Sequence, residues 1–170
     1  KIQRHIEEML VSPMSEISIV TGYLAGGIIR GIFVAAVVSL ITLFFTQLNI
    51  QYPVLAILVI VMTAGVFSLA GLLNAIFAKK FDDIAIIPSF VLAPLTYLGG
   101  VFYTITLLPD FWQKVSYFNP ILYMVNAMRF SVLGKSDIDI FTGILVILAF
   151  FIMLLCTAIY LLKKGVGIRE

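Results

Sequence analysis

The sequence predicts an all-α, polytopic membrane protein, and three observations support this fold class. Of its 170 residues, 62% are hydrophobic and only 12% are charged, whereas soluble domains average roughly 45–50% apolar and about 25% charged residues. The mean hydropathy is +1.14. Four runs are apolar over about 20 residues, the length that a helix needs to cross a bilayer. We therefore expect a helical bundle with four transmembrane spans, preceded by an amphipathic helix and interrupted, before the last span, by a re-entrant helical hairpin.

The amphipathic helix is predicted over residues 2–12. Apolar side chains recur there at helical spacing, and charged side chains take the opposite side. The apolar residues are Ile2, Ile6, Met9 and Leu10, and the charged residues are Lys1, Arg4, Glu7 and Glu8. This pattern is typical of a helix that docks on a cytoplasmic protein, and equally of an anchor that lies on the lipid surface.

The first span is expected over about residues 22–46, in a helix for which Ser15 is a suitable N-cap. Small residues at intervals of four positions allow a second helix to approach its backbone closely. These are Gly22, Gly26, Gly27 and Gly31.

Arg30 is the one charge embedded in this helix, where an arginine at mid-bilayer costs about 2.5–3.5 kcal/mol or more. If the crossing runs from Ile28 to Thr46, Arg30 lies near one end and its side chain reaches the interface. The other interpretation is a polar contact in a substrate path.

Two further spans are expected over about residues 54–78 and 84–103. Asn74, near the end of the first of these, is interpreted as a hydrogen-bond partner of a neighbouring helix rather than of a substrate. In the second, Pro88 and Pro94 each remove a backbone donor. We therefore expect a kinked helix that is lined by other helices, because the freed carbonyls need partners within the membrane.

Residues 108–134 are too polar to cross the membrane and too apolar for a solvated loop, so we expect them to enter it and return. Asn119 and Pro120 predict the start of a helix, and Gly134 predicts its end. Within it, polar residues recur every three to four positions, and we expect this stripe to face water at the interface. The stripe comprises Asn119, Tyr123, Asn126 and Arg129.

A solvated link that contains Lys135, Asp137 and Asp139 should then lead into a last span over about residues 140–162. With four crossings, a cytoplasmic start places most basic residues inside, as the positive-inside rule favours. Those on the inside would be Lys1, Arg4, Lys79, Lys80, Lys163, Lys164 and Arg169, and those outside Lys114, Arg129 and Lys135. Both ends of this chain are therefore expected in the cytoplasm, and the hairpin on the outer face.

The residue inventory argues against an enzyme. His5 is the only histidine, and none of the four predicted spans contains an acidic residue, so metal sites and proton relays lack ligands at membrane depth. No G-x-x-x-x-G-K-[ST] phosphate loop occurs, so the chain does not bind ATP by that route. The net charge of +2 gives no indication of nucleic acid. We expect no metal and no cofactor.

Several motifs resemble those of a known family. They are EEML-x-SP near the start, SLAGLLN, PLTYLGGVFY, Leu108-Pro109, Trp112, and Asn119-Pro120 followed by Tyr123 and Arg129. Over nearly its whole length the chain resembles ABC-2 type transporter permeases, bacterial inner-membrane proteins related to nodulation-factor and to O-antigen or capsule exporters.

The resemblance implies an architecture and two protein partners. Such permeases have six spans, so two would lie upstream of Lys1, and they work as homodimers with a separate cytoplasmic ATP-binding subunit that hydrolyses ATP. Residues 2–12 match the position of the family's coupling helix, and residues 108–134 match its re-entrant helices. The candidate ATPase contacts are Arg4, His5, Glu7, Glu8, Met9 and Leu10, and the hairpin residues are Trp112, Asn119, Pro120, Tyr123, Asn126 and Arg129.

The function that we expect is outward transport of an amphiphilic or glycan-type substrate by alternating access. Candidate residues of the substrate path or its gate are Arg30, Pro94, Tyr97, Phe102, Tyr103 and Tyr117. Aromatic side chains near an interface also serve as membrane anchors, so contact with lipid competes with this interpretation. A competing hypothesis is a membrane scaffold or assembly factor that recruits a cytoplasmic partner without transporting anything.

Overall fold

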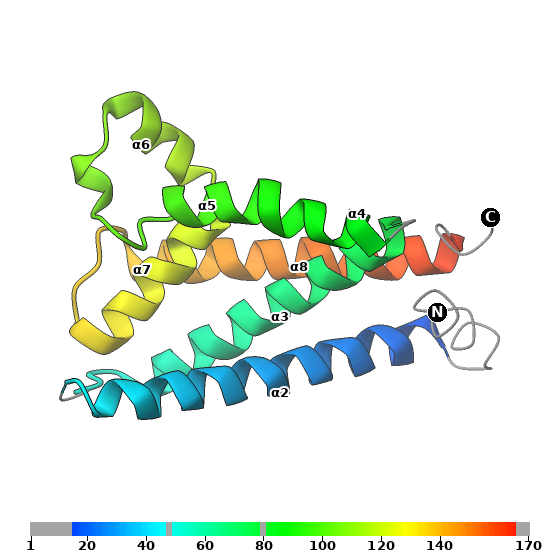
Figure 1. Ribbon diagram of the computed structural model, residues 1–170, viewed down its shortest axis with the longest axis horizontal. Coiled ribbons are helices and arrows are strands. Elements are labelled where there is room, and N and C mark those ends of the chain that lie inside the picture. The colour runs from blue at the N-terminus through cyan, green and yellow to red at the C-terminus, as the bar shows by residue number, and fades with distance from the viewer. Residues whose placement is uncertain (1–14, 47–48, 79–80, 166–170) are drawn as a thin grey trace.

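A computed structural model describes residues 15–46, 49–78 and 81–165, and this part of the chain is helical and contains no strand (Figure 1). Three of its helices are long and apolar enough to cross a membrane. They are α2 (Glu16–Leu43), α3 (Pro53–Phe77) and α8 (Ile140–Lys164). An all-helical fold with membrane-capable helices is thus confirmed. The amphipathic helix predicted over residues 2–12 lies outside the described residues.

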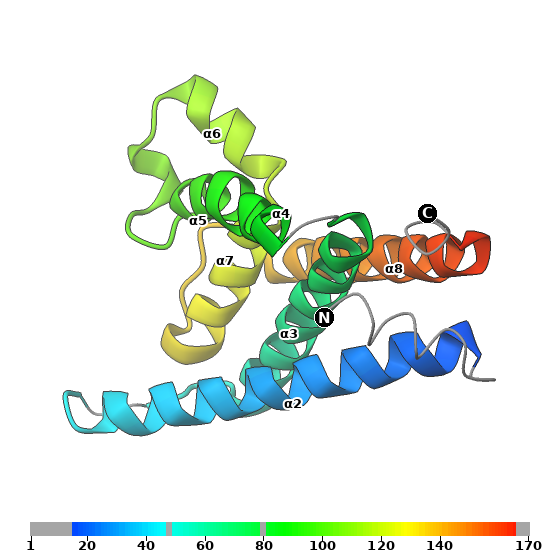
Figure 2. The same ribbon diagram turned by 45° about the vertical axis from the view of Figure 1, so that its right-hand side comes forward.

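Shorter helical elements lie between α3 and α8. They are α4 (Phe81–Ile86), the π-helical η1 (Ile87–Leu92), α5 (Ala93–Leu98), the 3₁₀-helical η2 (Ile105–Leu107), α6 (Asp110–Tyr117) and α7 (Pro120–Leu133). In Figures 1 and 2, the start of α2 and the end of α8 lie at one end of the long axis of the molecule. Helices α6 and α7 lie toward the opposite end.

Helix α3 forms the centre of the bundle, because it packs against α2, α7 and α8. Toward the hairpin, Val59 of α3 packs with Leu122 of α7 and Ile147 of α8 in one buried cluster. Toward the other end, Leu69 of α3 belongs to a second cluster with residues of α2 and α8. Burial of apolar surface therefore fixes α7 against α3 and α8.

Helices α2 and α3 approach closely at small residues. A side chain at Gly27 would collide with Ser68 of α3, and a side chain at Gly31 would meet Ala64. The Ser68 hydroxyl donates a hydrogen bond of 2.9 Å to the Tyr23 carbonyl of α2. The predicted glycine contact is therefore present at Gly27 and Gly31.

We expect Gly27→Leu to separate α2 from α3 and to lower the melting temperature of the purified full-length protein. The added side chain meets both the side chain and the backbone of Ser68, and overpacking of this kind costs about 1–3 kcal/mol. Gly22→Ala is the matched control, because a Cβ at Gly22 meets nothing within 4 Å. Equal melting temperatures for Gly27→Leu and the wild type would contradict the packing of these two helices.

The third predicted span differs from the expectation in length. The continuous helical segment runs from Phe81 to Leu98 rather than over residues 84–103. Gly99 is the C-cap of α5, and Gly100 follows with φ of +72°, a left-handed conformation that ends a helix and that glycine adopts without steric cost. Residues 99–103 therefore form a loop, because the glycine pair stops the helix.

The prolines are accommodated within this segment. Pro88 removes the donor for the Ile84 carbonyl, and the Asn74 side chain of α3 donates to that carbonyl at 2.9 Å. The prediction that Asn74 bonds a neighbouring helix is confirmed. The Ala93 amide reaches back to the Pro88 carbonyl in a π-turn. Within the described chain no helix covers the middle of the segment, where Phe90 is 76% exposed.

Capping residues fix where several of these helices begin and end. The Ser15 hydroxyl accepts from the Ser18 amide at the start of α2, and Gly134 ends α7 in the left-handed conformation, as predicted for both.

Asp139 caps α8 by accepting from the Thr142 amide at 2.8 Å. This backbone hydrogen bond, followed by one from the Thr142 hydroxyl, lowers the pKa of the Asp139 carboxyl from its usual value. The cap stabilises the fold above about pH 3.9 and is lost as the pH falls through the lower pKa of the folded state.

Candidate functional site

The hairpin made by α6 and α7 is the most polar part of the helical bundle. Helix α6 is short and largely exposed, whereas α7 packs against α3, α5 and α8. The two helices are joined at Phe118 and Asn119, and Pro120 occupies the first turn of α7, where its missing amide hydrogen costs nothing. Two helices joined by a short turn therefore lie within residues 108–134, and the second packs into the bundle. Whether they enter the membrane and return stays a prediction.

The polar stripe of α7 does not face water, contrary to the expectation. Asn119 and Asn126 are each 2% exposed and Tyr123 is 9% exposed. Buried polar groups need partners within the protein, and the loops around α7 supply them. The stripe therefore holds loops to the helix rather than presenting a wet surface.

The Asn119 side chain forms hydrogen bonds with two helices, α5 and α7. Its side-chain oxygen accepts from the Ile121 amide at 3.0 Å and so caps the start of α7. Its side-chain nitrogen donates to the Leu95 carbonyl, which lies in the last turn of α5 where no helical amide is available. One buried side chain thus joins the end of α5 to the start of α7.

Tyr123 lies one turn after Asn119 and Asn126 lies two turns after it, and both form hydrogen bonds with other loops. The Tyr123 hydroxyl donates to the Tyr117 carbonyl at 2.8 Å, which fixes the end of α6. The Asn126 side chain donates to the Leu122 carbonyl at 3.0 Å and accepts from the Asp137 amide at 3.0 Å. Asn126 therefore holds the link that leads into α8.

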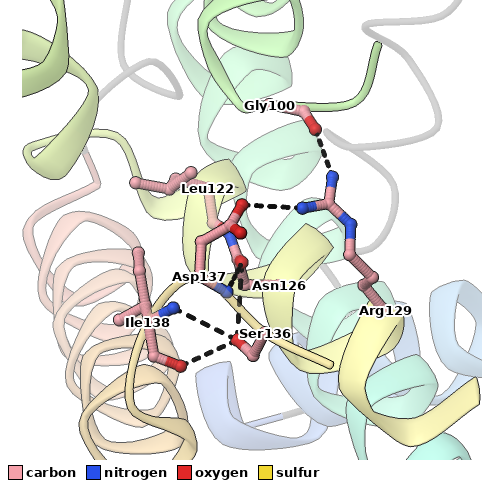
Figure 3. Close-up of polar contacts among 7 residues, drawn as sticks. All are labelled: Gly100, Leu122, Asn126, Arg129, Ser136, Asp137 and Ile138. Carbon is pink, nitrogen blue, oxygen red and sulfur yellow. Dashed lines mark hydrogen bonds and ion pairs between the residues drawn. The ribbon is translucent and has the colours of Figure 1, made fainter. Parts of the chain in front are cut away.

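Arg129 completes this set of contacts (Figure 3). One guanidinium nitrogen donates to the Gly100 carbonyl at 2.7 Å, and another forms an ion pair with the Asp137 carboxylate at 2.9 Å. The Arg129 side chain is 23% exposed and the Asp137 side chain 21%, so water screens the pair only partly. The loop after α5, helix α7 and the link before α8 meet at this residue.

The link over residues 135–139 is solvated as predicted, because Lys135, Asp137 and Asp139 are exposed, but it is also attached to α7. Asp137 pairs with Arg129, and the Ser136 hydroxyl donates to the Ile138 carbonyl at 2.7 Å. The link lines an open hollow of about 870 Å³ that Arg129 and Phe130 also border. The hollow contains both cationic and anionic side chains, so it has no single preferred charge of ligand.

The link between α2 and α3 is anchored to the end of α7. The Tyr52 amide donates to the Ser131 carbonyl at 2.9 Å. The Tyr52 ring stacks on Phe130 with centroids 5.1 Å apart. Tyr52, just before α3, is therefore attached to α7, as are the loop after α5 and the link before α8.

A second feature is an open groove of about 830 Å³ between α2 and α3 on one side and α5 and α7 on the other. Its lining is mainly apolar, and it includes Arg30. Arg30 lies at the middle of α2 and is exposed. Both interpretations of this residue, a side chain that reaches the interface and a polar contact in a substrate path, stay predictions.

Comparison with known proteins identifies the family. The family model for the ABC-2 type transporter matches residues 1–133. The chain belongs to the ABC-2 type transporter family. It is 49% identical, over its whole length, to the inner membrane transport permease YadH of Escherichia coli strain K12. It is also 22% identical over 159 residues to nodulation protein J of Rhizobium leguminosarum bv. viciae, covering 92% of this chain and 61% of that protein.

The chain spans 66% of the length of the YadH relative. No solved structure matches it. Within the ABC-2 family this chain is a multi-pass membrane protein of the permease type, and the residues named from the sequence can now be placed in it.

The residues predicted for the substrate path of this ABC-2 permease do not form one cluster. Tyr97 and Phe102 have ring centroids 5.9 Å apart, and the Tyr103 hydroxyl donates to the Tyr97 carbonyl at 2.6 Å, so these three gather after α5. Tyr117 lies at the end of α6. Pro94 is exposed on α5, and Arg30 lines the groove instead.

The predicted ATPase contacts and the predicted hairpin residue Trp112 have different outcomes. The candidate ATPase contacts, residues 4–10, lie outside the described residues. Trp112 of α6 is 45% exposed and meets Phe111 edge to face, which places it on the outer side of the hairpin.

Sequence reasoning missed Asp137 and Thr63. Asp137 is the acidic residue that pairs with Arg129, and the cation in an otherwise apolar helix was the signal that a carboxylate should lie nearby. Thr63 lines the groove and has a buried hydroxyl oxygen without a hydrogen-bond partner in the described part of the chain. Nothing in the spacing of α3 distinguishes Thr63 from its apolar neighbours.

Proposed function

We propose that this chain is the C-terminal part of the permease subunit of an ATP-driven exporter, residing in a bacterial inner membrane. The observation that carries the proposal is the 49% identity over the whole chain to an inner membrane transport permease. The cargo would be an amphiphilic or glycan-type molecule, as the family resemblance of the sequence motifs implies. A separate cytoplasmic subunit would hydrolyse the ATP, and the permease would pair with a second copy of itself in contact with lipid.

The orientation follows from charge. Lys163 and Lys164 lie in the last turn of α8, and the positive-inside rule favours a cytoplasmic position for that end. The α6–α7 hairpin would then face the outside, together with the Arg129 and Asp137 pair. The start of α2 lies at the same end of the bundle as the end of α8 (Figure 2), which is consistent with cytoplasmic ends for the described chain.

The fourth crossing would be the segment α4–η1–α5. Its 18 residues, Phe81 to Leu98, extend roughly 27 Å at 1.5 Å per residue, close to the thickness of the hydrocarbon core. Exposed apolar residues along it, such as Phe90 and Val91, and along α2, such as Phe33 and Ile29, suit contact with lipid or with the second permease copy.

In this proposal the motion of the ATPase reaches the spans through residues 2–12. We expect the double variant Glu7→Lys and Glu8→Lys to lower transport-coupled ATP hydrolysis at least about tenfold, because two attractive contacts with the ATPase become repulsive. The measurement is ATP hydrolysis and transport by the reconstituted complex of the full-length permease and its ATPase. Glu170→Lys is the control, because it reverses an acidic charge outside residues 2–12.

Normal coupling in the Glu7 and Glu8 double variant would contradict the assignment of residues 2–12. If, in addition, deletion of residues 108–134 left cellular function intact, the scaffold or assembly-factor hypothesis would replace the exporter.

A further inference from the structure

The groove between α2, α3, α5 and α7 follows one face of α2, which lies along one side of the bundle in Figures 1 and 2. Residues of that face recur three or four positions apart. They are Gly27, Arg30, Gly31, Val34, Ala35 and Val38. From the first to the last of them the face extends roughly 16 Å, about three helical turns. Ala64 of α3 meets Gly31 at the floor of the groove, and Met124 of α7 lies in the opposite wall. The groove is therefore long enough, and its floor lined by short enough side chains, to receive another helix.

Arg30 gives the groove a specific chemical requirement. It lies at the middle of α2 and forms no ion pair or hydrogen bond with any described residue. A guanidinium has five donors and no acceptor, and among apolar groups at membrane depth it is costly unless carboxylate or carbonyl oxygens bond to it. The occupant of the groove must therefore supply an oxygen acceptor opposite Arg30.

Three occupants are available to a membrane protein, and the page favours one. Lipid tails supply no acceptor. A second copy of this chain would meet the same patch about a two-fold axis, and two concave patches facing each other leave both grooves unfilled. The match with the YadH relative covers 66% of that protein, so about a third of a permease of that length lies outside the chain described here and can fill the groove.

We infer that a transmembrane helix from the part of the permease outside this chain packs in the groove. Its small or apolar side chains lie against Gly27 and Gly31, and an oxygen acceptor lies opposite Arg30. Small residues allow such close approach of helices, and polar groups then bond across the contact. The assignment deepens the proposed function and rests on one part of it, that this chain belongs to a longer permease. ATP hydrolysis and the cargo do not enter it.

The test is site-specific photo-crosslinking of the full-length permease in native membranes. Val34 and Val38, which are 52% and 55% exposed, are replaced one at a time by p-benzoylphenylalanine. Irradiation should join each position to a peptide of the same polypeptide outside residues 1–170, in a product with the mass of a monomer. Phe33, which is exposed on α2 but does not line the groove, is the matched control and should give no such product. Two groove positions are used so that one variant that fails to fold does not decide the result.

The role of Arg30 is tested in the same protein. Arg30→Gln should lower the crosslink yield from position 34 severalfold and lower the melting temperature by about 2–4 °C, because a charge-assisted hydrogen bond between two helices is lost. Arg30→Lys should retain part of both. Lys114→Gln, on the exposed helix α6, should change neither.

Crosslinks to a second copy, to a different protein or to lipid alone would each overturn the inference, as would equal products from Val34 and Phe33. Wild-type crosslink yield and melting temperature in Arg30→Gln would overturn the acceptor opposite Arg30. A crosslink within one polypeptide, in a permease with which no ATPase associates, would support the groove assignment and refute the exporter proposal.

Discussion

Asn119→Ala is expected to destabilise the folded protein by about 2–4 kcal/mol. The substitution removes the N-cap of α7, worth about 0.5–2 kcal/mol. It also leaves the Leu95 carbonyl without its donor, and an unsatisfied buried group costs about 1–3 kcal/mol. Both losses apply in full because Asn119 is 2% exposed, so water does not replace the missing partner. The measurement is thermal unfolding of the purified full-length protein.

Two further variants separate the contributions of Asn119. Asn119→Ser keeps an oxygen that can cap α7 but is too short to reach Leu95, so its loss should be intermediate. Asn49→Ala removes an exposed asparagine and should change the melting temperature little. An Asn119→Ala protein as stable as the Asn49→Ala protein would show that the two helix ends are not joined by this side chain.

Arg129→Gln is expected to release the loop after α5 and to cost about 2–3 kcal/mol. The substitution removes the charge-assisted hydrogen bond to the Gly100 carbonyl and the ion pair with Asp137, each of which includes a charged group. Amide hydrogen exchange should therefore become faster over residues 99–104. Asp137→Asn should cost less, because it leaves the contact of Arg129 with Gly100 intact.

The double variant Arg129→Gln with Asp137→Asn tests the pair itself. Its loss should be smaller than the sum of the two single losses by about 1 kcal/mol, the coupling expected for two groups in contact. Lys135→Gln is the matched control, since it removes a neighbouring cation of the same hollow. Strictly additive losses would mean that Arg129 and Asp137 do not interact in the folded protein.

Local chemistry explains which parts of this fold could be predicted. The Ser15 cap, the start of α7 at Asn119 and Pro120, and its end at Gly134 depend on a few neighbouring residues, and each was predicted correctly. The glycine contact of α2 was also predictable, although only Gly27 and Gly31 meet α3. Such features need no knowledge of tertiary packing.

Other features depend on residues that are distant in the sequence. The stripe of α7 was expected to face water, but the partners of Asn119 and Arg129 lie 24 and 29 residues earlier, at Leu95 and Gly100. The length of the third span was overestimated because apolar composition continues past the glycine pair that ends α5.

The central claim is that this chain belongs to a membrane subunit that works with a separate ATPase. The direct measurement is affinity purification of the full-length protein from native membranes, followed by assay of ATP hydrolysis in the purified material. We predict that a nucleotide-binding subunit copurifies in a stoichiometric complex, and that its hydrolysis of ATP changes when residues Glu7 and Glu8 are reversed in charge. A homogeneous permease preparation without a nucleotide-binding subunit and without ATP hydrolysis would contradict the account.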